Sequence, residues 1–92
     1  MSVKIEFFHS PACPHCPQAR RVLVEVAEEL GEGIEVEELN ILSQMGMGKA
    51  RGYRLDFVPT IVLDGEVKIV GVPSADQLRN AIQTRLNRES LL

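Results

Sequence analysis

The sequence predicts one α/β domain spanning residues 1–92, with its elements in the order β-α-β-α-β-β-α. Two observations carry this prediction. A strand pattern, a long amphipathic helix pattern and a second strand pattern form a β-α-β unit in the first half of the chain. In the second half, two apolar runs separated by Asp64-Gly65 are typical of a β-hairpin, and a last helix pattern follows them.

The first strand is predicted over residues 3–8, where apolar side chains alternate with Lys4 and Glu6. Phe8 makes the second face of the strand apolar at its end, so this strand is expected to be buried on one face and partly on the other. We expect Lys4 and Glu6 to be solvated strand positions.

A long helix is predicted after this strand, with Gly31 just beyond its end. Its apolar residues recur at the spacing of one helix face and are Ala19, Val22, Leu23, Val26, Ala27 and Leu30. Pro14 and Pro17 are expected in the first turn, where a missing N–H costs least. Arg20 and Arg21 are expected on the solvated face.

The next two elements are a strand over residues 34–39 and a short helix over residues 43–52. A strand that follows a strand and a helix crossover is expected to pair with the first strand in parallel. Ser43 is the predicted N-cap of the short helix, and Gly52 its terminator.

The hairpin is predicted from strands over residues 57–63 and 67–70, with Asp64-Gly65 supplying positive φ angles at the turn. Ser74 and Gln77 form a capping box for a last helix. The buried face of that helix is expected to consist of Leu78, Ala81, Ile82 and Leu86. Residues 86–92 are expected to fray.

Composition and charge exclude several classes of function. The net charge of −3 gives no basic surface for nucleic acid, and no apolar run approaches the roughly 18 residues of a membrane span. Because the first strand pattern begins at Val3, no signal peptide is expected before it, and we expect a cytoplasmic protein. We also expect the protein to be a monomer.

The two cysteines, Cys13 and Cys16, lie between the first strand and the long helix, separated by Pro14 and His15. In a reducing compartment such a pair is more often catalytic or metal-binding than structural. Cys13, at the helix N-terminus, is the expected thiolate nucleophile, stabilised by unpaired N–H groups and by His15. Cys16, one turn into the helix, is expected to be more buried and to resolve the intermediate.

Two alternatives remain open from the residues. The cysteines could bind a metal ion together with His15 or His9, in the manner of small metallochaperones. The chain could also be a binding module in which the thiols are incidental.

Cys13-Pro14-His15-Cys16 after the first strand and Val58-Pro59-Thr60 opening the third resemble the thioredoxin/glutaredoxin superfamily, over roughly residues 3–86. The resemblance implies a minimal thioredoxin fold with a four-stranded mixed sheet in the order 2-1-3-4. The first and last helices would cover one face and the middle helix the other. It also implies a cis peptide bond before Pro59, which would lie against the cysteine pair.

The implied function is a thiol–disulfide oxidoreductase that reduces protein disulfides through a mixed disulfide at Cys13. No cofactor is implied beyond the redox-active cysteine pair, and either a thioredoxin reductase or glutathione would supply electrons. The catalytic set would be Cys13, Cys16, Pro14, His15 and Pro59. The implied substrate-binding residues are Ala12, Val58, Thr60, Gly71 and Val72, with the main chain of Val58 pairing with an extended peptide.

Several positions depart from the family patterns. Ala12 replaces the tryptophan of typical thioredoxins, and Phe7 replaces their buried acid, which leaves Glu6 as the fallback proton acceptor. Gly71-Val72 replaces the Gly-Gly of glutaredoxins, which favours a reductase-fed protein over a glutathione-dependent one. The Pro-His dipeptide predicts a potential less reducing than that of a Gly-Pro thioredoxin.

Overall fold

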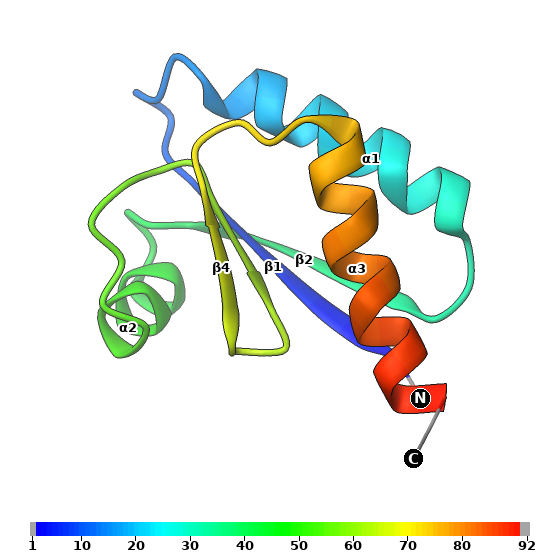
Figure 1. Cartoon of the computed structure of the whole chain (residues 1–92). Helices are drawn as coiled ribbons and strands as arrows, with labels where there is room; N and C mark the ends of the chain where they lie inside the picture. The colour runs from blue at the N-terminus through cyan, green and yellow to red at the C-terminus, as the bar shows by residue number, and fades with distance from the viewer. Residues whose placement is uncertain (1, 91–92) are drawn as a thin grey trace.

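A computed structural model describes residues 2–90, and its elements follow the predicted order (Figure 1). They are β1 (Val3–His9), α1 (Cys16–Leu30), β2 (Ile34–Asn40), α2 (Gln44–Gly52), β3 (Thr60–Leu63), β4 (Val67–Val70) and α3 (Ala75–Ser90). The predicted β-α-β-α-β-β-α fold is confirmed.

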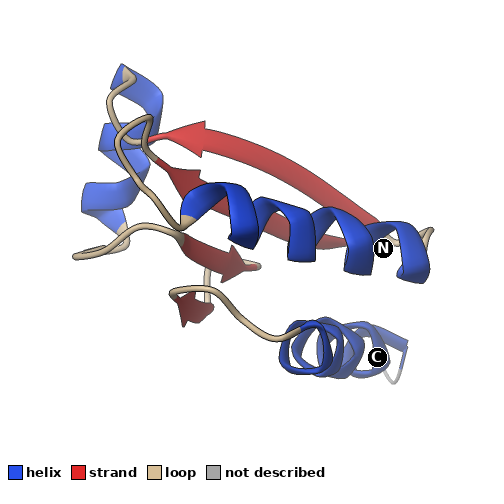
Figure 2. Cartoon of the chain, turned by 90° about the horizontal axis from the view of Figure 1, so that it is seen from above, coloured by secondary structure: helices blue, strands red, loops and turns tan. Residues whose placement is uncertain are grey.

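The four strands form one sheet in the order β2-β1-β3-β4. β1 pairs in parallel with β2, with Val3 opposite Ile34, and antiparallel with β3, with Ile5 opposite Leu63. Helices α1 and α3 cover one face of the sheet and α2 the other, as seen from two directions in Figures 1 and 2. The carboxyl end of β1 therefore leads directly into the loop that holds the cysteines.

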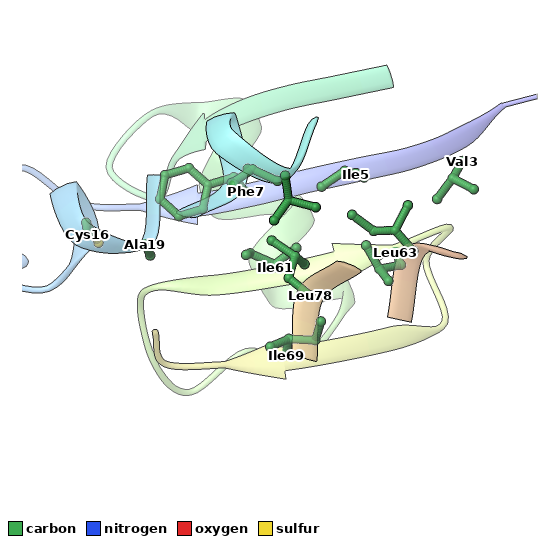
Figure 3. Packing of buried hydrophobic residues seen from close by; sticks show 12 residues of the cluster. Val3, Ile5, Phe7, Cys16, Ala19, Ile61, Leu63, Ile69 and Leu78 are labelled. Carbon is green, nitrogen blue, oxygen red and sulfur yellow. The ribbon is translucent and has the colours of Figure 1, made fainter. Parts of the chain in front are cut away.

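The larger apolar core lies between the sheet and helices α1 and α3. It includes Val3, Ile5 and Phe7 along β1, with Ile61 and Leu63 beside them on β3 (Figure 3). A smaller cluster of Phe8, Leu39 and Val62 lies on the opposite face, under α2. The alternation of β1 thus divides its side chains between two apolar layers, because both faces of the strand are covered.

The predicted caps and turn are confirmed by their hydrogen bonds and backbone angles. The Oγ of Ser43 accepts a hydrogen bond from the N–H of Gly46 at 3.0 Å, which caps α2. Ser74 caps α3 in the same way, accepting from the N–H of Gln77 at 3.0 Å. Asp64 and Gly65 have φ angles of 50° and 71°, as a tight hairpin turn requires.

Two predicted boundaries are wrong. β3 begins at Thr60, because the preceding residues 57–59 leave the sheet and form an irregular segment that includes Pro59. α3 continues to Ser90, so the frayed tail predicted over residues 86–92 is helical as far as that residue; residues 91–92 lie outside the described chain. No helix within residues 2–90 has the length and apolar character needed to cross a bilayer.

The expectation that Glu6 is solvated is also wrong, whereas Lys4 is exposed as predicted. Glu6 is 2% exposed because α2 covers this part of the sheet. Its carboxylate accepts hydrogen bonds from Tyr53 Oη at 2.6 Å and from Lys49 Nζ at 3.1 Å. Hydrogen bonds to Glu37 and to Glu6 raise the pKa of Lys49, so the buried carboxylate has a charged partner.

Candidate redox site

Cys13 and Cys16 form a disulfide in the loop between β1 and α1, with their Cα atoms 5.5 Å apart. The loop is held by a hydrogen bond from the N–H of Cys13 to the carbonyl of Ser10 at 3.1 Å. Helix α1 begins at Cys16, with His15 as its N-cap. Cys16 is therefore the first helical residue. The prediction that it lies one turn inside the helix is wrong.

The helix start also moves the two flanking prolines relative to the prediction. Pro17 lies in the first turn of α1, as expected, but Pro14 precedes the helix. The difference arises because the two residues after Cys13 form a turn, and the chain becomes helical only at Cys16. Cys13 consequently lies just outside the helix N-terminus, where first-turn N–H groups without intrahelical partners are near.

The two sulfur-bearing residues differ in burial, as the sequence predicted. Cys16 is 3% exposed and belongs to the larger core, at the end of the cluster near Phe7 and Ala19 (Figure 3). Cys13 is half-buried and packs against the edge of the same core. A reagent therefore approaches Cys13 more readily than Cys16.

The segment before β3 lies next to the disulfide loop. The Val58–Pro59 peptide bond is cis, and Pro59 is buried. The carbonyl of Pro59 accepts a hydrogen bond from the N–H of Gly71 at 2.8 Å, which fixes this segment to the end of β4.

Thr60, one of the implied substrate-binding residues, is buried. It is 1% exposed, and its Oγ1 donates a hydrogen bond to the carbonyl of Phe57 at 2.6 Å. This hydrogen bond links the first residue of β3 to the segment that precedes the strand. Thr60 thus holds residues 57–59 through its hydroxyl, and it does not line the groove described below.

A surface groove runs from the disulfide loop to the end of β4. We call it the disulfide groove, and it is lined by His15, Gln18, Phe57, Val58, Pro59, Val70, Gly71 and Val72. Three predicted substrate-binding residues, Val58, Gly71 and Val72, therefore lie together beside Pro59. Ala12 is exposed in the same loop as Cys13 but does not line the groove.

The groove also contains residues that the sequence analysis missed. Phe57 and Val70 are 68% and 59% exposed and line the same groove, and exposed apolar side chains that lie together are typical of an interaction site. Each directly flanks a predicted site residue in the sequence, which was the available signal. Gln18 lies in the first turn of α1 and carried no such signal.

A second group of side chains surrounds Phe7 on the α1 side. The guanidinium of Arg20 lies 5.7 Å from the centre of the Phe7 ring and forms an ion pair with Glu38. His9 stacks on the same ring at 5.6 Å. Burial, and then the charge of Arg20, lower the pKa of His9, against a raising effect of Glu38.

The metal-binding alternative requires further ligands beside the cysteines. His15 lines the disulfide groove, whereas His9 stacks on Phe7. Among residues 2–90, no three side chains of the metal-ligating types are grouped so that they could hold an ion.

The predicted role of Glu6 as a proton acceptor requires its carboxylate to lie on the same side of the sheet as the cysteines. It projects from the face of β1 opposite Phe7 and Cys16, toward α2. The fallback role predicted for Glu6 therefore has no support in the structure.

Taken together, an accessible and a buried cysteine joined at a strand–helix junction beside a cis-proline define a thiol–disulfide oxidoreductase. Residues 1–83 match the family described as "Thioredoxin domain", and the chain belongs to this family. A protein named "Thioredoxin" from Methanocaldococcus jannaschii is 48% identical over 84 residues, which cover 91% of this chain and 96% of that protein. A "Probable Thioredoxin" from Methanothermobacter marburgensis is 42% identical over 86 residues, covering 94% and 99% of the two chains.

Solved structures show the same fold at lower identity. The crystal structure of chloroplastic thioredoxin z superposes with a TM-score of 0.76 at 22% identity, covering 90% of this chain and 77% of that one. A malarial protein superposes with a TM-score of 0.73 at 17% identity, covering 91% and 97%.

Proposed function

We propose that this protein reduces disulfides of other proteins, with Cys13 as the nucleophile and Cys16 as the resolving cysteine. The Cys13 thiolate attacks one sulfur of the substrate disulfide, forms a mixed disulfide and releases the other sulfur as a thiolate. The Cys16 thiolate then attacks the Cys13 sulfur, which forms the intramolecular disulfide and releases the second substrate thiolate. Both released thiolates take protons from water, so two electrons pass from the protein to the substrate.

The observation that carries this assignment is the difference in burial between the two cysteines. Cys16 is 3% exposed whereas Cys13 is half-buried at the surface, so an incoming disulfide meets Cys13 first. The first-turn N–H groups of α1 lie near Cys13 and favour its thiolate. These features support attack by Cys13 and resolution by Cys16.

The disulfide groove supports a polypeptide as the substrate. Within residues 2–90, neither the N–H nor the carbonyl of Val58 has a hydrogen-bond partner. A main chain left unpaired beside a reactive cysteine suits pairing with an extended peptide. Protein disulfides are therefore the proposed substrates.

The proposed electron donor is a thioredoxin reductase, consistent with the thioredoxins that this chain resembles. Glutathione remains the alternative donor, and Gly71-Val72 in place of Gly-Gly argues against it. We propose a monomer that works as a reductase in the cytoplasm, where a reducing environment keeps the pair in its dithiol form.

The cysteine roles are tested by trapping the intermediate. Reduced Cys16→Ser is expected to accumulate a mixed disulfide with a protein substrate, visible as a covalent adduct in non-reducing electrophoresis and mass spectrometry. Cys13→Ser, the matched control, is expected to form no such adduct and to reduce no substrate. An adduct on Cys16 in the Cys13→Ser protein, with turnover retained, would reverse the assignment.

The direction of flux is tested by equilibration with defined glutathione buffers. We expect one two-electron transition at a potential above the thioredoxin value of about −270 mV, because of the Pro-His dipeptide. A value near about −120 mV would instead favour an oxidase or isomerase. Accumulation of a glutathione adduct at Cys13 in the same samples would favour glutathione as the donor.

A further inference from the structure

A second hollow adjoins the disulfide groove on the side of α2. We call it the α2 hollow, and it is lined by Ile41, Met47, Ala50, Arg51, Leu55, Asp56, Phe57 and Val58. Phe57 and Val58 line both depressions and so form the wall that they share. The hollow has a volume of about 220 Å³, below the roughly 300–1,000 Å³ of small-molecule sites. Its size suits one side chain better than a cofactor.

The inner surface of the α2 hollow is apolar. Ile41, Ala50 and Leu55 are partly buried against the smaller core cluster under α2. Met47 and Phe57 are 39% and 68% exposed, so two large apolar side chains that line the hollow also face solvent. Arg51 and Asp56 carry opposite charges and give the hollow no preference for a charged ligand. The chemistry matches an apolar group.

We propose that the α2 hollow is a second substrate subsite, which takes one large apolar side chain of an extended peptide whose cysteine reacts at Cys13. This inference rests on the proposed function and specifies its substrates. It predicts that protein disulfides with a leucine-like residue close to the reacting cysteine are preferred over those with polar neighbours.

The position of Val58 links the two subsites. Its main chain has no hydrogen-bond partner within residues 2–90, and the residue lines both depressions. A peptide paired with this main chain is extended, and successive side chains of an extended chain point in opposite directions. One residue can therefore face the disulfide groove while a neighbouring residue enters the α2 hollow.

Two exposed methionines on α2 provide a matched pair of variants. Met47 lines the α2 hollow, whereas Met45, 63% exposed, lines neither depression. Met47→Glu and Met45→Glu make the same chemical change on the same helix, between residues of similar helix propensity. A difference between them reports the hollow and cancels the general effect of an added negative charge.

The test measures second-order rate constants for oxidation of the pre-reduced protein by three disulfides. Two are symmetric peptide disulfides that carry either leucine or serine beside the cysteine, with leucine tried on each side. The third is hydroxyethyl disulfide, which reaches Cys13 without filling the hollow. We expect the wild-type protein to react about tenfold faster with the better leucine peptide than with the serine peptide, since burial of one large side chain supplies that much.

Met47→Glu is expected to abolish most of this preference, while Met45→Glu retains it and both variants react normally with hydroxyethyl disulfide. Equal rates for the leucine and serine peptides with the wild-type protein, or equal losses in the two variants, would overturn the subsite. A wild-type dimer that Met47→Glu dissociates in sedimentation would assign the hollow to a second copy and also overturn it. Failure of the proposed function is distinguishable, because the wild-type protein would then reduce none of the three disulfides.

Discussion

Replacing the buried Thr60 hydroxyl tests whether the segment before β3 must be held in shape for protein substrates. Thr60→Val keeps the β-branched form but removes the hydrogen bond to the carbonyl of Phe57. Thr60→Ser keeps the hydroxyl and removes only a methyl group. The pair separates the hydrogen bond from the packing of the same side chain.

The two variants should lose similar stability for different reasons. The hydrogen bond is 2.6 Å long and its donor is 1% exposed, so its loss in Thr60→Val costs about 1 kcal/mol. The methyl group lost in Thr60→Ser is worth about 0.8 kcal/mol. For a domain of this size either loss lowers Tm by about 4–8 °C.

Their activities should differ. Within residues 2–90, residues 57–59 are held to the sheet by two main-chain acceptors, the carbonyls of Phe57 and Pro59. In Thr60→Val, binding of the peptide must supply about 1 kcal/mol to order this segment. The rate constant for reduction of a peptide disulfide by this variant should therefore fall about fivefold. Thr60→Ser should reduce a peptide disulfide at the wild-type rate.

The assay compares a peptide disulfide with hydroxyethyl disulfide for both variants, alongside thermal unfolding by circular dichroism. Hydroxyethyl disulfide does not pair with Val58, and its rate should not change in either variant. Equal peptide rates for the two variants, at matched stability, would refute the role assigned to the hydroxyl. So would a Thr60→Val protein that is slower with both substrates.

Two further predictions concern stability. Tyr53→Phe and Glu6→Gln should be coupled by about 1.5–3 kcal/mol in a double-mutant cycle from urea unfolding, because Tyr53 donates to a buried carboxylate; simple additivity would show that the contact contributes nothing. His9 has a lowered pKa in the folded protein, so the unfolded chain binds its proton more readily, and stability is lost as pH falls through the ordinary value of 6.5. His9→Gln should therefore lose less free energy of unfolding than wild type between pH 7.5 and pH 5.5, and parallel profiles would contradict this.

The order and type of the elements were predictable from local pattern because each is specified by neighbouring residues. The 3.6-residue period of α1, the caps at Ser43 and Ser74, and the positive φ angles of Asp64-Gly65 involve interactions within a few positions of the chain. The sheet order, however, was predicted only from the family resemblance, because the pairing of strands that are far apart in the chain produces no local sequence pattern.

The site was predictable in part for the same reason. Cys13 and Cys16 are only three positions apart in sequence, and their unequal burial follows from the start of an amphipathic helix. The segment around Pro59 could be assigned to the site only through the resemblance. The precise start of α1 was mispredicted, because the turn after Cys13 depends on how the loop packs against its surroundings.

The sequence alone therefore determined the α/β fold class, the cysteine pair and the residues beside it, since these depend on chain-local geometry and chemistry. Only the tertiary structure decided that Glu6 is buried while Lys4 is exposed, because α2 covers one part of that sheet face and leaves the other open. It also decided that Thr60 holds the segment before β3 through its hydroxyl, and that Phe57 stands between two hollows. Burial and cavity shape arise from elements distant in the chain, and no local period encodes them.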